Sequence, residues 1–262
     1  MSWTTKRQHR SRYPATLFLI LVFVFLLAPL VLVVLFSFHK LPRLSFPFSG
    51  ASLRWYREVL GDPLVIRAFG RTALAAAVSG VIAGLLGFFA ALGVGQVGPR
   101  ARALILVIAM VPLVFPLLLY AIGLAVFYHS LGVGFSLWAT IAGHVVVALP
   151  FVFLVLTAAM ERFRFSLLEA AHDLGASKYQ AFTSVTVPIL LPAVLGAMLL
   201  AMAISVDEFI IAFFTAGQQK TLPLLMYGRI NLGIEPSLNA IGTLLLMSTM
   251  ILAFFSARKS TL

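Results

Sequence analysis

Two adjacent carboxylates, Asp207 and Glu208, are the residues of this chain whose type and position most directly suggest chemistry. They are the only acidic residues inside its long apolar stretches. A charged group buried in such a stretch is costly, which makes it a candidate functional site. A carboxylate there could attract an ammonium group, and the rings of Phe209, Phe213 and Phe214 could face it. The alternative is a structural acid that pairs with an arginine or caps a broken helix, beside aromatic residues that serve packing.

His144 and Ser79 lie in two different apolar stretches and are the other candidate reactive groups. No G-x-S-x-G surrounds Ser79, and the sequence contains no H-E-x-x-H, so a hydrolytic site has little support. A lone histidine of this kind more often hydrogen bonds to a neighbouring helix than binds a ligand. The chain has no cysteine, which excludes disulfides, thiolate metal sites and a cysteine nucleophile.

The composition indicates that the elements holding these residues in place are membrane helices. Of 262 residues, 61% are hydrophobic and only 10% are charged, and the mean hydropathy is +1.07. Apolar stretches of about 20 residues recur, each long enough to cross a bilayer as a helix. We therefore predict an all-α, polytopic membrane protein with one domain over residues 1–262. The net charge of +11 lies mostly beside apolar stretches, so it indicates anchoring to membrane lipid rather than nucleic-acid binding.

The pattern predicts six membrane spans. The first apolar stretch is longer than the core of a signal peptide and lacks a small-residue cleavage site, so we expect it to be retained. Pro112 and Pro116 should kink the third span, and Pro150 the fourth. The spans are expected at about 15–38, 72–95, 102–127, 136–160, 189–214 and 238–257.

Basic residues predict that both termini and the segment 161–188 face the cytoplasm, because Lys and Arg concentrate on that side. The excess of basic residues on that side is modest, since the outer loop 39–71 is also rich in arginine. We expect a short interfacial helix in that loop, with Trp55 and Tyr56 at headgroup depth. The second outer segment, 215–237, contains several glycines and prolines and is expected to be a turn-rich connection.

The segment 169–188, EAAHDLGASKYQAFTSVTVP, carries too many charged groups to lie in hydrocarbon. Ala170 and Ala171 are small enough to let another surface come close, and Gly175 can adopt the positive φ that ends one short helix before another begins. Leucines 167, 168 and 174 and Tyr179 could supply apolar contacts. The segment therefore predicts a docking element for a soluble partner, with an interfacial helix that has no partner as the alternative.

The same segment resembles the EAA motif of ABC importer permeases, which reads E-A-A, three residues, G, nine residues and I-x-L-P. Here the final element is Val185-Thr186-Val187-Pro188, with valine replacing isoleucine and leucine. The resemblance implies that a helix–turn–helix docks into the ATPase subunit and transmits its motion to the membrane. The residues it assigns to ATPase coupling are Glu169, Ala170, Ala171, Asp173, Gly175 and Ala176.

The chain also resembles the spermidine/putrescine branch of these permeases. The similar stretches are SVDEFIIAFFTAG at 205–217, TLPLLMYGRI at 221–230, GIEPSLNA at 233–240 and HVVVALPFVF at 144–153. The resemblance implies a type I (MetI-like) importer fold in a bacterial inner membrane. It also implies a second permease subunit that is a different chain, a dimer of ATPase subunits and an external substrate-binding protein.

The substrate that this resemblance implies is a polyamine, with Asp207, Glu208 and Phe209 in its pathway. Opines, aminophosphonates and other small organic ions remain open. The sequence has no G-x-x-x-x-G-K-[ST] P-loop, so we expect no enzyme activity, cofactor or metal in this chain, with ATP and Mg²⁺ bound by the partner ATPase. An ion-driven secondary transporter has less support, because there is no inverted repeat.

Overall fold

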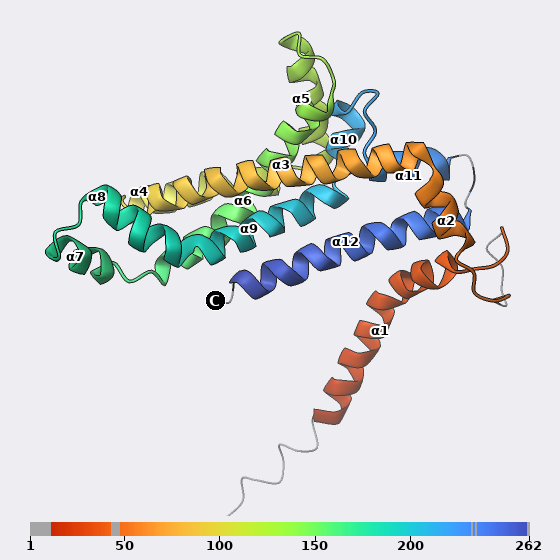
Figure 1. Ribbon diagram of the computed structural model, residues 1–262, viewed down its shortest axis with the longest axis horizontal. Helices are drawn as coiled ribbons and strands as arrows, with labels where there is room; N and C mark the ends of the chain where they lie inside the picture. Colours follow the sequence, from red (N-terminus) through yellow and green to blue (C-terminus); the bar gives the residue numbers. More distant parts are fainter. Residues whose placement is uncertain (1–11, 43–47, 232, 234, 261–262) are drawn as a thin grey trace, which may run out of the picture. The chain divides into compact units, whose positions relative to one another are not determined.

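The computed structural model describes residues 12–42, 48–231, 233 and 235–260, and the described chain is built from helices (Figure 1). It separates into two compact units. The first comprises residues 1–61 and 229–244, and the second comprises residues 62–228 and 245–262.

The first unit contains the helices α1 (Arg12–Ser37) and α2 (Arg54–Gly61). The predicted short helix in the loop 39–71 is confirmed as α2, but Trp55 does not project outwards to serve as a headgroup anchor. Its side chain is only 3% exposed, and its indole N–H donates a hydrogen bond to the His39 carbonyl at 2.6 Å. The Tyr56 hydroxyl shares a hydrogen bond with Ser37 at 2.7 Å. These contacts fold the loop back onto the end of α1.

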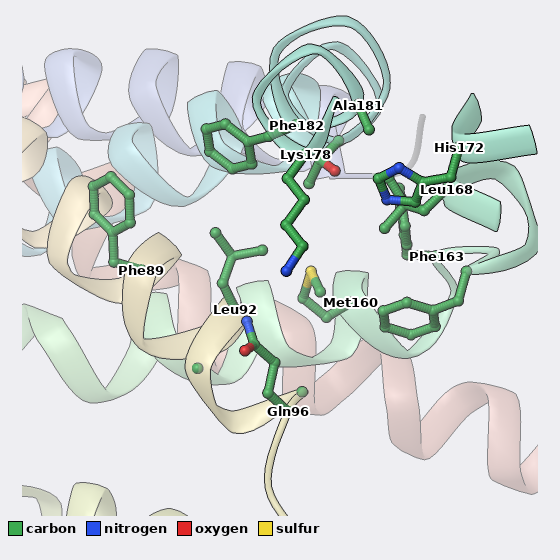
Figure 2. Close-up of a pocket in the computed structure, with 14 residues that line it drawn as sticks. Phe89, Leu92, Gln96, Met160, Phe163, Leu168, His172, Lys178, Ala181 and Phe182 are labelled. Carbon is green, nitrogen blue, oxygen red and sulfur yellow. The ribbon is translucent and has the colours of Figure 1, made fainter. Parts of the chain in front are cut away.

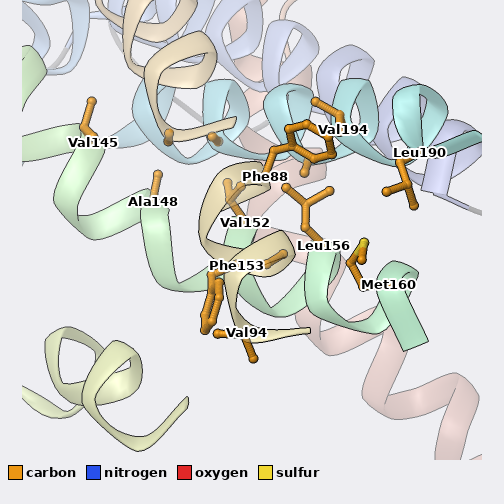
Figure 3. Packing of buried hydrophobic residues seen from close by; sticks show 14 of the residues in the cluster. Phe88, Val94, Val145, Ala148, Val152, Phe153, Leu156, Met160, Leu190 and Val194 are labelled. Carbon is orange, nitrogen blue, oxygen red and sulfur yellow. The ribbon is translucent and has the colours of Figure 1, made fainter. Parts of the chain in front are cut away.

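The second unit is centred on three long helices that pack together, α3 (Pro63–Val94), α6 (Leu137–Glu161) and α9 (Val187–Asp207). Figure 3 shows Phe88 of α3, Val152 and Leu156 of α6 and Val194 of α9 meeting in one cluster. Several alanines with no exposed surface complete it. Within a membrane, lipid is as apolar as these side chains, so close packing of small residues holds helices together.

Close packing between α3 and α9 depends on glycine. A methyl group on Gly80 would lie 2.4 Å from Met202 Cγ and 2.9 Å from the Met198 carbonyl oxygen, and one on Gly84 would lie 2.2 Å from Met198 Cγ. Distances this short require atoms to shift, and at Gly80 one of the atoms in the way belongs to the backbone of α9. These glycines therefore allow the close approach of α3 and α9.

We expect Gly80→Ala to destabilise the protein, although alanine is the better helix former. Overpacking typically costs about 1–3 kcal/mol, and the loss should appear as a lower melting temperature of the purified protein in detergent. Gly123→Ala is the matched control, because a methyl group on Gly123 meets no other atom within 4 Å. Equal melting temperatures for the two variants would contradict the close approach.

The predicted third span is divided into α4 (Pro99–Val114) and α5 (Leu117–Ser130), which are bent by 93°. Proline disfavours the helical conformation in the residue before it, and Phe115, before Pro116, is extended with φ −72° and ψ 133°. Both prolines were expected to kink one helix, but Pro116 stands at a break that ends it, whereas Pro112 lies inside α4. In the described part of the chain, five helices are long and apolar enough to cross a membrane, or six if this pair counts as one broken span.

Two further boundaries differ from the prediction. The helix α3 begins at Pro63 rather than at 72, because the Asp62 carboxylate caps it by accepting a hydrogen bond from the Leu64 N–H at 2.7 Å. The segment 215–237 is not only turns, since it contains the helix α11 (Leu222–Ile230). The helix α12 (Pro236–Ser260) follows, and its Ser256 hydroxyl donates to the Gly196 carbonyl of α9 at 2.7 Å.

Candidate functional site

The segment singled out by its charges folds as two short helices, α7 (Ser166–Asp173) and α8 (Lys178–Ala181), at one end of the second unit (Figure 1). We call residues 166–181 the α7–α8 hairpin. Gly175 has φ +86°, as predicted. The N–H of Gly175 bonds to the His172 carbonyl at 2.9 Å, and the N–H of Ala176 bonds to the Ala171 carbonyl at 3.0 Å. This is the Schellman arrangement, which ends a helix at a left-handed residue.

The second helix of the hairpin starts with its own cap. The Ser177 hydroxyl accepts a hydrogen bond from the Gln180 N–H at 3.3 Å, and the Gln180 side chain accepts one from the Ser177 N–H at 2.8 Å. This reciprocal capping box satisfies backbone donors that would otherwise need water. His172 adds a hydrogen bond between its Nδ1 and the Ala176 carbonyl oxygen at 3.0 Å. Local contacts alone therefore fix the shape of the hairpin.

The outer surface of the hairpin carries large apolar side chains that nothing in the described chain covers. Leu174 is 89% exposed and Tyr179 is 76% exposed. Leu168, also expected to face a partner, packs instead against the core cluster. Of the residues assigned to coupling, Ala171 and Ala176 are half-buried and the others are exposed: Glu169, Ala170, Asp173 and Gly175. Exposed apolar side chains among charged neighbours are typical of a protein-docking surface.

The hairpin is continuous with a membrane helix. After α8 the chain widens into one π-helical turn, η1 (Phe182–Thr186), and runs on into α9, so the helix that contains the predicted fifth span starts at Lys178, before the expected span boundary at 189. Pro188 explains the wider turn, because its ring clashes with the carbonyl of Ser184, four residues earlier, and it has no N–H to donate. A displacement of α8 would therefore act directly on α9.

The far end of α9 carries the acidic pair, and the structure corrects its expected geometry. The helix stops at Asp207, and Glu208 is extended with φ −71° and ψ 107°, so the two carboxylates do not sit on consecutive helical positions. The short helix α10 (Ile210–Thr215) follows. The Glu208 carboxylate accepts a hydrogen bond from the Ile211 N–H at 3.0 Å. The predicted span 189–214 is therefore two helices with an acidic break, which we define as Asp207 and Glu208.

The Asp207 carboxylate has a different environment. It is exposed and accepts a hydrogen bond from the Thr249 hydroxyl of α12 at 3.1 Å. Among the described residues, neither acid forms a salt bridge. The two carboxylates thus differ in that Glu208 caps a helix, whereas Asp207 keeps acceptor capacity for another group.

Three aromatic rings gather beside the acidic break. The ring of Phe209 lies 5.6 Å from that of Phe213 and 5.0 Å from that of Tyr227, and the rings of Phe213 and Tyr227 are 5.6 Å apart. Phe214 joins this group by packing against Phe213, with the centroids of the two rings 5.1 Å apart. Tyr227 was missed from the sequence, because its segment was expected to be turns. Its position in α11 brings it to the acidic break from another part of the chain.

The other candidate groups do not form a reactive site. His144 Nδ1 and the Ser205 hydroxyl are 2.6 Å apart and link α6 to α9, and His144 is only 2% exposed. The Ser79 hydroxyl donates to the Ala76 carbonyl at 3.2 Å, so Ser79 and His144 do not pair as reactive groups, and the expected interhelical role of His144 is confirmed. Within the described ranges, no group of three or more His, Asp or Glu residues lies together to hold a metal ion.

The arrangement of helices defines the class of protein. It matches a bacterial ABC transporter involved in the import of the acidic polysaccharide alginate, with TM-score 0.71 and 18% identity over 95% of this chain and 94% of that chain. It also matches the MetNI methionine ABC transporter, with TM-score 0.57 and 19% identity over 76% and 98% of the two chains. The fold is therefore that of a MetI-like ABC transporter permease, as predicted.

The sequence places the chain in a family. Residues 83–259 match the family described as binding-protein-dependent transport system inner membrane component, and the chain belongs to this family. The putrescine transport system permease protein PotI of Escherichia coli (strain K12) is 31% identical over 247 residues, which cover 91% of this chain and 87% of PotI. The spermidine/putrescine transport system permease protein PotC of the same strain is 26% identical over 240 residues, covering 91% and 90%. The chain is the permease component of an ABC importer in the inner membrane.

Proposed function

We propose that this permease imports a polyamine, such as putrescine or spermidine, and that Asp207 binds one of the ammonium groups. The names of PotI and PotC support the substrate class. The observation that carries the proposal is the acidic break, where an exposed carboxylate without a salt bridge in the described chain is followed two residues later by Phe209, whose ring packs with Phe213 and Tyr227. A carboxylate supplies charge, and the face of an aromatic ring attracts an ammonium ion.

In this proposal the two acids have separate tasks. Glu208 holds the break open as the cap of α10, and Asp207 offers its carboxylate to the substrate. Phe209, Phe213 and Tyr227 form the wall against which the methylene groups of a polyamine would pack. A chain of methylenes with charged ends fits such a mixed site, because apolar walls and one placed charge together fix its orientation.

The α7–α8 hairpin is the part that couples this permease to ATP hydrolysis. We propose that the ATPase subunit receives Leu174 and Tyr179 in a surface groove, with Glu169 and Asp173 at its margin. ATP and Mg²⁺ are then bound by the ATPase, and this chain supplies no cofactor site. Because α8 is continuous with α9, movement of the ATPase would reach the acidic break along one helix.

The complete importer contains more chains than this one. We propose two ATPase subunits, a second permease that is a different chain, and an external substrate-binding protein. A solved alginate importer is described in complex with its periplasmic protein. The proposal places both termini and the α7–α8 hairpin in the cytoplasm, and the acidic break toward the outer side.

Substrate-stimulated ATP hydrolysis tests the substrate class. The importer, assembled with its binding protein in proteoliposomes, should hydrolyse ATP faster when putrescine or spermidine is added. An opine or an aminophosphonate should give no stimulation at the same concentration. Stimulation by the aminophosphonate and not by either polyamine would overturn the proposed substrate while leaving the permease assignment intact.

A further inference from the structure

A cavity of about 620 Å³ lies behind the α7–α8 hairpin, on the side that faces the membrane helices. Its walls come from the ends of α3 and α6 and from the hairpin and η1 (Figure 2). Leu92 and Met160 line it from the membrane helices, and Phe182 lines it from η1. This size is within the range of pockets that bind small molecules.

One cation reaches into this apolar cavity. Figure 2 shows the Lys178 side chain extending from the start of α8 toward Leu92 and Met160, with the His172 ring at one side. None of the described residues that line the cavity is acidic. Lys178 forms no salt bridge with any described residue. The His172 ring already contacts the Ala176 carbonyl. The cavity therefore combines apolar walls with one positive charge that has no counterion in the described part of the chain.

The position of the cavity is that of a bilayer boundary. The membrane helices α3 and α6 end beside it, at Val94 and Glu161, and the charged hairpin begins just beyond. Exposed Arg162 and Arg164 follow the end of α6. Basic pockets between membrane helices at such a boundary bind the headgroups of anionic lipids. A soluble anion would match the lysine but not the apolar walls.

We propose that this cavity binds an anionic phospholipid, with its phosphate on Lys178 and one acyl chain against Leu92, Met160 and Phe182. The lipid would lie between the hairpin and the membrane helices, where it would support the hairpin from behind. This ligand is additional to the transported substrate and does not depend on its identity. The site also leaves the exposed side chains of Leu174 and Tyr179 available to the ATPase.

Photolabelling of the assembled importer tests the site. The probe is a phosphatidylglycerol with a photoactivatable group in its acyl chain, used in nanodiscs of phosphatidylcholine, and the labelled residues are mapped by mass spectrometry. We expect labels near Leu92 and Phe182. Lys178→Gln should reduce them about fivefold, the contribution of one basic residue near a membrane surface. Lys178→Arg should retain the labelling, and so should the distant control Lys220→Gln.

A second variant blocks the cavity without touching its charge. Gly93 lines the cavity, and a methyl group on it meets no other atom within 4 Å, so Gly93→Phe should fill the space and remove the labels. Gly123→Phe is the control, since Gly123 also has open space around it.

Three results would overturn the lipid site. The first is equal labelling by a phosphatidylcholine probe, and the second is labelling that survives both Lys178→Gln and Gly93→Phe. The third is labelling that occurs only in the permease without its ATPase, which would indicate that a side chain of the ATPase fills the cavity in the assembled importer. Because the labelling needs neither substrate nor ATP, its failure is distinguishable from failure of the transport proposal.

Discussion

Replacing Gly175 with valine is expected to reduce uptake roughly tenfold or more, together with the coupling of ATP hydrolysis to transport. Gly175 has φ +86°, a conformation that a β-branched residue adopts only at a cost. A left-handed residue with a Cβ costs about 1–2 kcal/mol, and each ~1.4 kcal/mol lowers the equilibrium constant for forming the docking shape about tenfold. Uptake of labelled substrate and substrate-stimulated ATPase activity in proteoliposomes measure the effect.

Two variants separate a loss of docking from general damage. Gly175→Asn should retain most activity, because asparagine tolerates a positive φ. Gly132→Val places the same strain in another turn, where Gly132 has φ +69° and open space around it. We expect Gly132→Val to affect coupling much less, since that turn joins α5 to α6 and is not part of the hairpin. If Gly132→Val and Gly175→Val uncouple the importer equally, the hairpin has no special role.

Replacing Asp207 with asparagine is expected to weaken polyamine transport roughly tenfold to a hundredfold. The substitution keeps the size of the side chain and its hydrogen bond from Thr249, but it removes the charge that would bind an ammonium group. Hydrogen bonds to charged groups contribute about 1.5–3 kcal/mol, which corresponds to this range. The measurement is the dependence of uptake on polyamine concentration, with the amount of assembled importer determined in parallel.

Variants of Glu208 provide the matched comparison. Glu208→Gln should leave transport close to normal, because an amide oxygen can still accept the hydrogen bond from the Ile211 N–H. Glu208→Ala should lower the stability of the purified protein, because α10 then loses its cap. Equal loss of transport and assembly in Asp207→Asn would instead assign Asp207 a structural role. A larger transport defect in Glu208→Gln than in Asp207→Asn would instead assign substrate binding to Glu208 and the structural role to Asp207.

The hairpin was predictable from sequence because its signals are local. Gly175 ends α7, and Ser177 with Gln180 caps α8, each through contacts within a few residues. The charges of the segment also excluded it from hydrocarbon. Its continuity with α9 was not predicted. Proline usually occupies the first turn of a helix, so a new helix was expected to start near Pro188, but here Pro188 follows a π-turn that accommodates it.

The geometry of the acidic break could not be predicted from local sequence signals. Apolar residues continue on both sides of Asp207 and Glu208, so hydropathy predicts one uninterrupted span. The break depends on a side-chain cap, and the approach of Tyr227 depends on how α11 packs. A similar reason applies to Pro116, since proline predicts a disturbance but not whether the helix kinks or ends. Long-range packing decides these outcomes.

Cross-linking from the α7–α8 hairpin to the ATPase tests the central claim most directly. The chain has no cysteine, so single cysteines at Ala171 or Ser177 can each be joined to cysteines on the ATPase surface, with His129→Cys in α5 as the control. We expect cross-links from Ala171→Cys and Ser177→Cys that change in yield when ATP is bound, and none from His129→Cys. Cross-links from His129→Cys, with none from either hairpin position, would contradict the coupling role of the hairpin.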